Sequence, residues 1–376
     1  MKLAVLKERR AGEARVAVTP ETVKKLKALG LDVTVESAAG NGARIADADY
    51  AAAGAAIAPD IANTVRDADI ILKVRGPEPD EVAAMRQGAV YVSLLAPYSE
   101  KDRIAQLAER GVNAFAMELI PRISRAQSMD VLSSQANLAG YKAVIDAAAT
   151  FGRAFPMMMT AAGTIAPARA FIMGVGVAGL QAIATARRLG AIVSATDVRP
   201  ATKEQVESLG ATFVAVIDDE FKQAETASGY AKPMSAEYQA KQAALVAEHI
   251  KKQDIVITTA LIPGRKAPVL VTEEMVATMK PGSVIVDLAA EQGGNCPLTR
   301  ADQVVEAQGI TIIGYTNLPS RLAVDSSNLY ARNLFNFVSL IVDKKTGALA
   351  LNWDDEIVKG AGVTRDGQIV HPSLKG

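Results

Sequence analysis

The fold of this chain is decided by the stretch Ala170-Phe171-Ile172-Met173-Gly174-Val175-Gly176-Val177-Ala178-Gly179. Its apolar beginning predicts a strand, and the glycines follow that strand directly. Residues 180–189 have helical periodicity and end at Gly190, and a second apolar segment, 191–196, then leads to Asp197. A strand, a glycine turn, a helix and a second strand in this order are the context that the dinucleotide-binding fingerprint requires.

Each glycine of the motif has its own physical task. Gly174 permits the tight turn out of the strand, Gly176 leaves room for a pyrophosphate near the backbone, and Gly179 lets the helix pack closely on the strand. The helix N-terminus offers N–H groups and a partial positive charge to phosphates. Asp197 stands where a carboxylate accepts hydrogen bonds from an adenosine ribose, which favours NAD over NADP. The alternative is a glycine-rich turn kept only for packing.

Length and composition indicate a globular protein of two domains. The chain has 376 residues, of which 49% are hydrophobic, and this excludes wholesale disorder. Lys plus Arg and Asp plus Glu both number 41, so nothing indicates a nucleic-acid partner. The single cysteine, Cys296, excludes a disulfide within the chain and a cysteine-based zinc cluster, and no metal is expected. We expect Cys296 to be a buried small residue rather than a nucleophile.

Nothing at the start of the chain is typical of a signal peptide. The apolar run 1–6 is short and is followed by four charged residues. The longest uncharged run, 170–186, falls short of the ~20 residues that a membrane-spanning helix needs. We therefore expect the chain itself to be soluble.

Strands and helices alternate along most of the chain, which is typical of an α/β fold with mostly parallel sheets. A helix is expected to begin at Thr19 and Pro20 and to end at Gly30, and a long alanine-rich helix is expected at 134–150. The predicted architecture is therefore two Rossmann-like parallel-sheet domains separated by a cleft and joined by long helices. The predicted strands of the first series are 2–6, 32–36, 70–74, 89–94 and 113–117, and those of the second are 170–173, 191–196, 212–217, 255–259, 283–288 and 311–314.

One segment, 218–235, interrupts this alternation. It is polar and contains Gly229, Tyr230 and Pro233, which favour a mobile loop over a helix. An aromatic residue in such a loop suggests a lid that closes on a ligand. A surface loop with an incidental tyrosine is an equally good interpretation from the residues alone.

Several motifs resemble a known family. The segments Lys7-Glu8, Arg15-Val16-Ala17-Val18-Thr19-Pro20 and Ile71-Leu72-Lys73-Val74 resemble the alanine dehydrogenase and transhydrogenase superfamily. The segment 122–135, RISRAQSMDVLSSQ, is similar to the Arg–Gln–Asp loop of the NAD(H)-binding component, domain I, of the proton-translocating nicotinamide nucleotide transhydrogenases. The glycine motif, Asp197-Val198-Arg199 and the loop around Tyr230 fit the same component, so the resemblance covers nearly the whole chain.

The resemblance also implies which residues form the site. Without it, Arg122 and Asp130 would be interpreted as a surface ion pair of little energetic value. The resemblance implies that the nicotinamide and its ribose are surrounded by Arg122, Gln127, Asp130 and Ser133. It places Val177, with Gly174, Gly176 and Gly179, near the pyrophosphate, and Asp197, Val198 and Arg199 on the adenosine side. Gly229 and Tyr230 are expected to belong to the closing loop, and Leu261 is expected to line the pocket.

The resemblance further implies an activity and partners. The expected enzyme is a Re/Si-specific, proton-translocating NAD(P)⁺ transhydrogenase, in which this chain binds NAD(H) in the cleft between its domains. The NADP(H) would be held by a partner subunit, domain III, and protons would cross in a membrane component, domain II. A homodimer is expected, cytoplasmic and peripheral to the inner membrane through its partners. The helix 326–343 is expected to return to the first domain, which gives domains of 1–133 plus 321–376 and of 134–320.

Alanine dehydrogenase is the competing member of the superfamily. Its reaction needs a proton donor and groups that bind a carboxylate, and that family uses an Arg, a Lys, a His and an Asp. Arg15 and Lys73 are present here, but Leu95 stands in place of the histidine and Glu291 in place of the aspartate. Hydride transfer between two nicotinamides needs no proton donor, so the loss favours transhydrogenation and leaves the role of Arg15 and Lys73 open.

Two further observations bear on this choice. The only histidines, His249 and His371, lie away from the expected position, and we expect both to be solvated surface groups. A non-catalytic NAD-sensing module would use the same nucleotide site and lid, and it remains a third interpretation.

Overall fold

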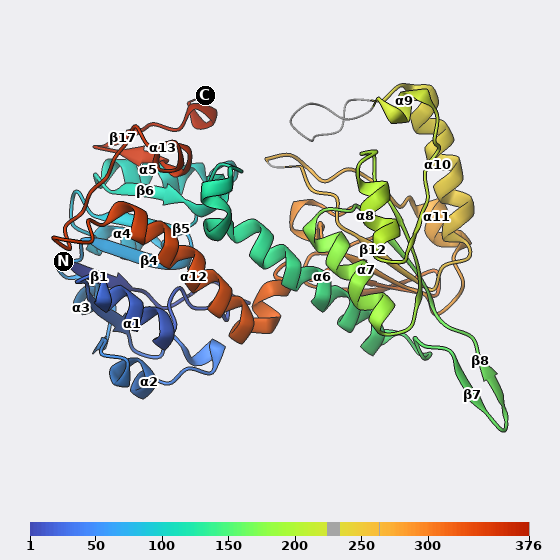
Figure 1. Cartoon of the computed structure of the whole chain (residues 1–376), viewed down its shortest axis with the longest axis horizontal. Coiled ribbons are helices and arrows are strands. Elements are labelled where there is room, and N and C mark those ends of the chain that lie inside the picture. Colours follow the sequence, from blue (N-terminus) through green and yellow to red (C-terminus); the bar gives the residue numbers. More distant parts are fainter. Residues whose placement is uncertain (224–233, 263, 376) are drawn as a thin grey trace. The chain divides into compact units, whose positions relative to one another are not determined.

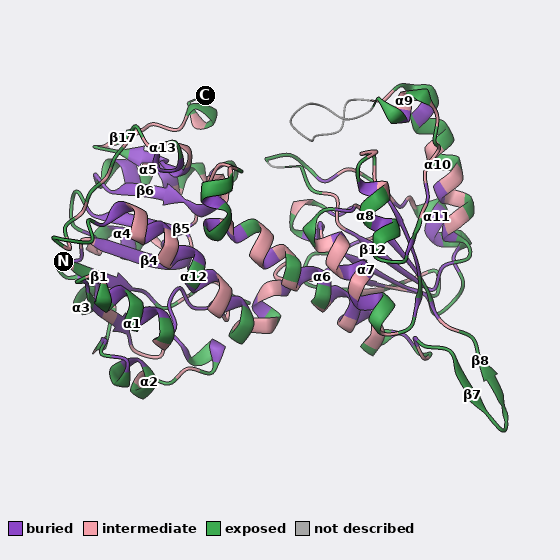
Figure 2. Cartoon of the chain, in the orientation of Figure 1, coloured by how far each residue is buried: buried purple, intermediate pink, exposed green. Residues whose placement is uncertain are grey.

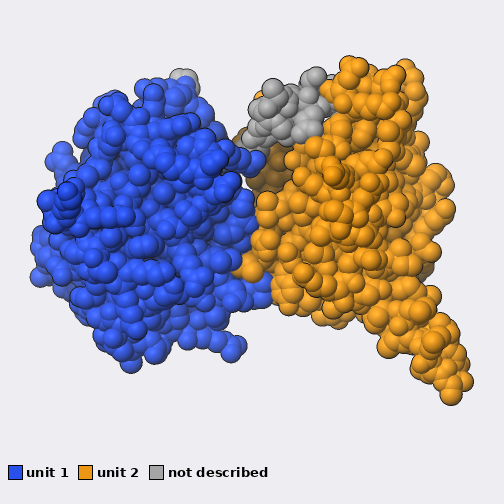
Figure 3. All heavy atoms as spheres, viewed as in Figure 1, with its two compact units in different colours: residues 1–135, 319–376 blue, residues 136–318 orange. Residues whose placement is uncertain are grey.

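The structure is a computed structural model that describes residues 1–223, 234–262 and 264–375. The chain divides into two units, which Figure 3 draws in different colours: residues 1–135 with 319–376 form unit 1, and residues 136–318 form unit 2. The sequence-based boundaries were 133/134 and 320/321. No helix of the described residues is long and apolar enough to cross a membrane.

Unit 1 contains a parallel six-stranded sheet (Figure 1). Its strand order is that of the doubly wound dinucleotide-binding folds, with the reversal between the two central strands. In spatial order the strands are β3 (Ala56–Ala58), β2 (Asp32–Glu36), β1 (Lys2–Val5), β4 (Ile70–Arg75), β5 (Val90–Leu94) and β6 (Asn113–Ala116).

Both faces of this sheet are buried, as expected for parallel strands between helices. Alternate residues face opposite sides: Ile70 and Leu72 belong to one apolar cluster and Ile71 to the other. The first cluster includes residues of α1 (Pro20–Ala28), α12 (Ala323–Ile341) and α13 (Glu356–Ala361), and the second includes residues of α3 (Ile61–Val65), α4 (Pro79–Ala84) and α5 (Lys101–Glu109). Unit 1 also contains α2 (Asp47–Ala52), the pair β16 (Thr364–Arg365) and β17 (Gln368–Ile369), and several short 3-10 helices.

Unit 2 contains a seven-stranded sheet whose order follows the same rule, with one antiparallel strand at its edge. The strands are β11 (Thr212–Phe213), β10 (Ile192–Thr196), β9 (Arg169–Met173), β12 (Ile255–Thr258), β13 (Val284–Asp287), β15 (Ile310–Ile313) and the antiparallel β14 (Val304–Ala307). One face packs on α6 (Val131–Thr150), α7 (Val177–Arg188) and α8 (Thr202–Ser208), and the other packs on α10 (Ala236–Ile250) and α11 (Glu273–Thr278).

A hairpin of β7 (Met158–Thr160) and β8 (Gly163–Ile165) extends from unit 2. Every residue of both strands is exposed, and Figure 2 shows the hairpin as a uniformly exposed arm. Its exposed side chains include Met158, Met159 and Ile165, which is unusual because apolar residues in a strand normally pack on a core.

The predicted fold class is confirmed, and most predicted strands match within one or two residues. The helix after Thr19 begins at Pro20, with the Thr19 N–H donating to Thr22 Oγ1 at 2.8 Å, and Gly30 follows its end with φ of +83°. The alanine-rich helix begins three residues before the expected Ser134, at Val131.

Two predictions about segments need correction, and some elements were not predicted. The strand expected at 212–217 is only Thr212–Phe213: the Val214 N–H still donates to the Ala195 carbonyl oxygen at 2.8 Å, but residues 214–218 are not part of a strand. The segment expected to be a loop contains a short helix, α9 (Asp219–Lys222), which Asp218 caps by accepting from the Phe221 N–H at 2.9 Å. The hairpin at 158–165 and the edge strand β14 were not predicted.

Candidate functional site

The glycine turn of unit 2 joins β9 to α7 at the point where the strand order reverses, between β9 and β12. Gly174 has φ of +102°, a conformation that a side chain would strain. A Cβ on Gly179 would lie 1.9 Å from the Gly174 carbonyl oxygen, so only glycine lets the helix approach. A Cβ on Gly176 would meet nothing within 4 Å, and the space in front of this residue is therefore open.

The N-terminus of α7 has no side chain to satisfy its N–H groups, because its capping residue is Gly176. Such a terminus carries free donors and a partial positive charge, which suits an anion.

The approach of α6 to this end of α7 was not predicted: a Cβ on Gly140 would lie 2.0 Å from the Ala178 carbonyl oxygen. A glycine within an otherwise alanine-rich helix was the signal in the sequence.

Asp197 lies at the carboxyl end of β10 and holds the turn. One carboxylate oxygen accepts from the Val175 N–H at 2.8 Å and from Arg199 Nη2 at 2.9 Å. The other accepts from the backbone N–H and from Nε of Arg199, both at 2.9 Å. A carboxylate has about four acceptor positions, so a ribose hydroxyl can bind Asp197 only by sharing or replacing a bond to Arg199.

Apolar side chains stand exposed around this edge of the sheet. Val177 begins α7, Val198 follows β10 and Leu261 follows β12, and between 39% and 49% of each is exposed. Because all three follow the carboxyl ends of strands, they lie on the edge where ligands of such folds bind. Exposed apolar groups near free backbone donors fit a ligand with rings and phosphates.

The loop predicted to meet the nicotinamide belongs to unit 1 and ends at α6. Asp130 caps that helix, because its carboxylate accepts from the Ser133 N–H at 2.9 Å and from Ser133 Oγ at 2.6 Å. Arg122 and Gln127 are exposed. Within the described part of the chain Arg122 forms no ion pair with Asp130, so the interpretation of these two residues as a surface pair is wrong.

Helix α12 anchors this loop, a feature that the sequence reasoning missed. Asn333 Nδ2 and Asn336 Nδ2 donate to the Ser128 carbonyl oxygen at 2.8 and 3.0 Å. Asn333 Oδ1 accepts from Ser134 Oγ at 2.8 Å. The available signal was an amide on the mostly apolar, buried face of α12.

The structure thus groups the predicted residues in two places. Arg122, Gln127, Asp130 and Ser133 lie in one loop and helical turn of unit 1, and the glycine turn, Asp197-Val198-Arg199 and Leu261 lie on the carboxyl edge of the sheet of unit 2. Gly229 and Tyr230, predicted for the closing loop, lie outside the described residues.

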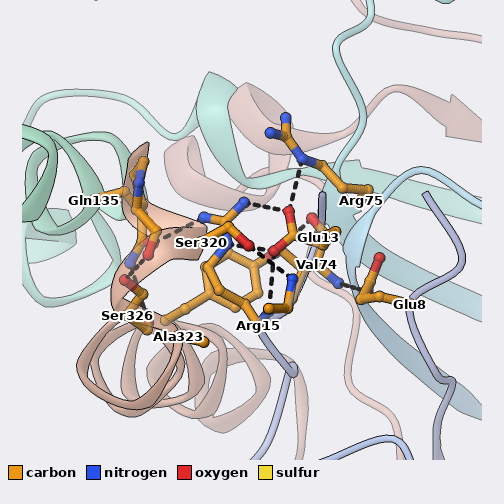
Figure 4. A network of polar contacts seen from close by, with 12 residues as sticks. Glu8, Glu13, Arg15, Val74, Arg75, Gln135, Ser320, Ala323 and Ser326 are labelled. Carbon is orange, nitrogen blue, oxygen red and sulfur yellow. Dashed lines mark hydrogen bonds and ion pairs between the residues drawn. The ribbon is translucent and has the colours of Figure 1, made fainter. Parts of the chain in front are cut away.

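Arg15, whose role the sequence left open, is paired inside unit 1 (Figure 4). Its Nη2 and Nε lie 2.6 and 2.8 Å from the two carboxylate oxygens of Glu13, and its Nη1 donates to Gln135 Oε1 at 2.8 Å. Arg75 Nε binds the same carboxylate at 3.1 Å. Burial acts to lower the pKa of Arg15, which is 2% exposed, but the hydrogen bond and charge of Glu13 outweigh it and raise that pKa.

Lys73 has an internal partner as well. Its Nζ lies 2.7 Å from Glu81 Oε2, and both side chains are buried. Glu8 stands nearby and accepts from the Val74 N–H at 2.6 Å, while its other oxygen has no hydrogen-bond partner among the described residues. Burial raises the pKa of Glu8 from 4.5 to about 8, although the charge of Lys73 acts to lower it.

Leu95 and Glu291 stand at the positions where alanine dehydrogenases are expected to carry a histidine and an aspartate. Leu95 is 1% exposed and packs in an apolar cluster, and Glu291 is exposed. Cys296 is buried as expected. The expectation of two solvated histidines was wrong for His249, whereas His371 is partly exposed and bonds a neighbouring exposed serine. His249 Nε2 lies 2.7 Å from Ser194 Oγ and its ring packs 4.7 Å from that of Phe171, while His371 Nδ1 lies 2.7 Å from Ser373 Oγ.

Two family models match the chain. Residues 4–139 match the model described as alanine dehydrogenase/PNT, N-terminal domain, and residues 143–372 match the corresponding C-terminal domain. The chain is 58% identical to the first portion of the NAD(P) transhydrogenase alpha subunit of Rhodospirillum rubrum over 381 aligned residues, which cover 100% of this chain and 99% of the relative.

Two further comparisons include a transhydrogenase and an alanine dehydrogenase. A solved transhydrogenase structure from Sinorhizobium meliloti superposes with a TM-score of 0.90 and 56% identity, covering 98% of this chain and 100% of that one. An alanine dehydrogenase of Halomonas elongata is 32% identical, with 100% of this chain and 96% of that protein covered. The chain is therefore similar to both branches and more similar to the transhydrogenases.

Proposed function

The chain belongs to the alanine dehydrogenase/PNT family, and on that premise we propose that it is the NAD(H)-binding component of a proton-translocating transhydrogenase. NADH binds to this chain as a substrate, and its hydride passes to NADP⁺ held by a partner subunit. Proton translocation takes place in a separate membrane component.

The observation that carries the proposal is the glycine turn. Gly174, Gly176 and Gly179 have the conformation, the open space and the close packing that a pyrophosphate-binding turn needs. Asp197 fixes the turn through Val175 and offers a carboxylate on the adenosine side. A negative charge there disfavours the additional 2′-phosphate of NADP(H), which supports NAD(H) as the substrate of this chain.

Hydride transfer between two nicotinamides requires no proton donor or acceptor from this chain. A hydride passes directly from one nicotinamide C4 to the other when the two lie roughly 3–3.5 Å apart and water is excluded. Buried Leu95 has no proton to give, and direct hydride transfer requires none. The task of this chain is to bind NADH and to hold its ring in a fixed orientation.

We assign that task to the loop before α6. Gln127 and Arg122 are exposed, and the described residues give neither side chain a hydrogen-bond or ion-pair partner, so both are free to contact the nicotinamide. Asp130 and Ser133 are held to one another by two hydrogen bonds. They fix the end of the loop and offer their remaining acceptor positions to the ribose. Tyr230 is proposed as the residue that closes over the bound nucleotide.

The alternative, an amino-acid dehydrogenase, is disfavoured by the internal pairing of Arg15 and Lys73. A substrate carboxylate would have to displace Glu13 from Arg15 or Glu81 from Lys73. Breaking either buried ion pair is unfavourable, although Glu13 keeps Arg75 and Glu81 keeps Arg9 as partners. A purely NAD-sensing module remains the second candidate, since it would use the same turn.

The partners follow from the same proposal. The relative with 58% identity is named as one portion of an alpha subunit, which supports further subunits that carry the NADP(H) site and the membrane component. We also propose a homodimer. Met157, Met158, Met159 and Ile165 expose apolar surface on and beside the hairpin, and an unpacked apolar arm of this kind favours association with a second copy.

The test mixes this chain with a purified NADP(H)-binding component. Rapid exchange of hydride between NADH and an NADP⁺ analogue supports the proposal. Saturable NADH binding without any exchange contradicts it and favours the sensor, and alanine-dependent reduction of NAD⁺ by this chain alone favours the dehydrogenase.

A further inference from the structure

A buried carboxylate at the end of β13 holds the loop that follows that strand. Asp287 is 1% exposed and accepts five hydrogen bonds, and the described residues supply no cation to it. Its donors are Thr258 Oγ1 (3.0 Å), the Ala289 N–H (3.0 Å), the Asn295 N–H (2.8 Å), the Cys296 N–H (3.2 Å) and Thr299 Oγ1 (2.6 Å).

Asn295, fixed in this way by Asp287, holds a second loop. Its side chain is fully buried and pairs with both backbone groups of one residue: Oδ1 accepts from the Ala260 N–H at 3.1 Å, and Nδ2 donates to the Ala260 carbonyl oxygen at 2.9 Å. Nδ2 also donates to the Pro268 carbonyl oxygen at 2.7 Å. The start of the loop after β12 is therefore tied to the loop after β13.

The same backbone segment is tied to the glycine turn on its other side. Thr259 Oγ1 donates to the Gly174 carbonyl oxygen at 3.1 Å. Ala260 thus lies between a contact to the turn and the amide of Asn295. The next residue, Leu261, is 48% exposed, and its position depends on these two attachments.

The strand order of the sheet indicates which half of the nucleotide lies beside the segment of Ala260 and Leu261. Dinucleotides bind across the reversal point, one mononucleotide to each half of the sheet. Asp197 follows β10 on the half that meets the adenosine ribose, and β12 and β13 belong to the other half. Leu261 and the backbone of Ala260 therefore face the nicotinamide mononucleotide.

We propose that Asn295 is a positioning residue for the nicotinamide half of the bound nucleotide. It holds the Ala260 backbone, and through it Leu261, beside the glycine turn, while Asp287 holds Asn295. The inference rests on NAD(H) binding as proposed above, and it does not depend on transhydrogenation.

The test compares two ligands on one variant, Asn295→Ala. ADP-ribose lacks the nicotinamide ring, and NADH carries it. Loss of Asn295 leaves the Ala260 and Pro268 backbone groups without partners and lets the segment move. The dissociation constant of NADH is expected to rise by about tenfold, equivalent to ~1.4 kcal/mol, while that of ADP-ribose changes by less than about twofold. A purely structural role would not change this ratio.

Gln253→Ala is the matched control. Gln253 is a buried amide just before the amino end of β12, and it bonds His249 at 3.0 and 3.1 Å. Its loss removes similar hydrogen bonds at the opposite end of the same strand, so it is expected to lower stability without changing the ratio of the two dissociation constants.

Asp287→Asn, which keeps the shape of the side chain, provides the same comparison if Asn295→Ala does not fold. An unchanged ratio in the folded variant, or an equal change in Gln253→Ala, overturns the inference. If the unaltered chain binds neither ligand, the proposed function itself fails, so the two failures are distinguishable.

Discussion

Arg15 lies against Glu13 in a two-point ion pair, with Nη2 2.6 Å from Oε2 and Nε 2.8 Å from Oε1, and both side chains are almost fully buried. Buried guanidinium groups of this kind bind carboxylates in many sites. In this chain the carboxylate is part of the protein. The pair therefore gives Arg15 a structural role and leaves it unavailable to an amino-acid substrate.

Glu13→Gln is expected to lower the free energy of unfolding by about 3–5 kcal/mol, because it leaves the buried Arg15 charge without its partner. Urea unfolding followed by circular dichroism measures the loss. Lys25→Ala is the control, since Lys25 and Glu21 form an exposed pair whose loss costs less than about 1 kcal/mol. Equal small losses in both variants would contradict the structural role of Arg15.

The protonation of Glu8 is expected to make the stability of the chain depend on pH. Its pKa in the folded chain is about 8 instead of 4.5, so the folded state binds a proton that the unfolded state releases between these values. Stability from this group is complete below pH 4.5 and is lost as the pH rises toward 8. Glu8→Gln should therefore flatten the decline between pH 5 and 8, as followed by urea midpoints. A decline as steep as that of the unaltered chain would contradict the assignment.

Two alanine substitutions in the glycine turn are expected to affect different properties, one the stability of unit 2 and the other the affinity for NADH. Gly179→Ala places a Cβ 1.9 Å from the Gly174 carbonyl oxygen and is expected to destabilise unit 2 severely. Gly176→Ala meets nothing within 4 Å, so thermal stability should change little while NADH affinity falls by about tenfold or more. Calorimetry and NADH titration separate the two effects. Normal NADH affinity in Gly176→Ala would be inconsistent with a pyrophosphate at this place.

Gln127 and Asp130 should differ in what they affect. Gln127→Ala removes an exposed side chain and is expected to slow hydride transfer more than it weakens NADH binding, with stability unchanged. Asp130→Ala also removes the cap of α6 and should lower stability by about 1 kcal/mol. Single-turnover rates, NADH titrations and unfolding midpoints measure the three quantities. Equal losses of rate and affinity in Gln127→Ala would contradict its positioning role.

The sequence predicted the fold well where the signal is local. Apolar strands of four to six residues, the glycine turn and the Thr19–Pro20 helix start depend on neighbouring residues, and the structure confirms them. The hairpin at 158–165 was missed because its methionines are exposed, whereas apolar runs are normally interpreted as core. The cap at Asp130 was readable from its place before an apolar helix, but Arg122 nearby favoured an ion pair.

Contacts between distant residues were not predictable in the same way. Asn295 and Ala260 are 35 positions apart, and no periodicity connects them. Ser128 and Asn333 are 205 apart, and their contact depends on where α12 packs. The pairing of Arg15 with Glu13 is short in sequence, yet the loop that folds the two side chains together has no regular pattern.

The central claim is tested most directly by following the hydride itself. NADH deuterated at the transferring C4 position is mixed with this chain, the NADP(H)-binding component and NADP⁺ for a single turnover, and the NADPH is analysed by mass spectrometry. Direct transfer between nicotinamides predicts that the deuterium appears at C4 of NADPH. NADPH without the label, or no NADPH although NADH binding is saturated, would contradict the account.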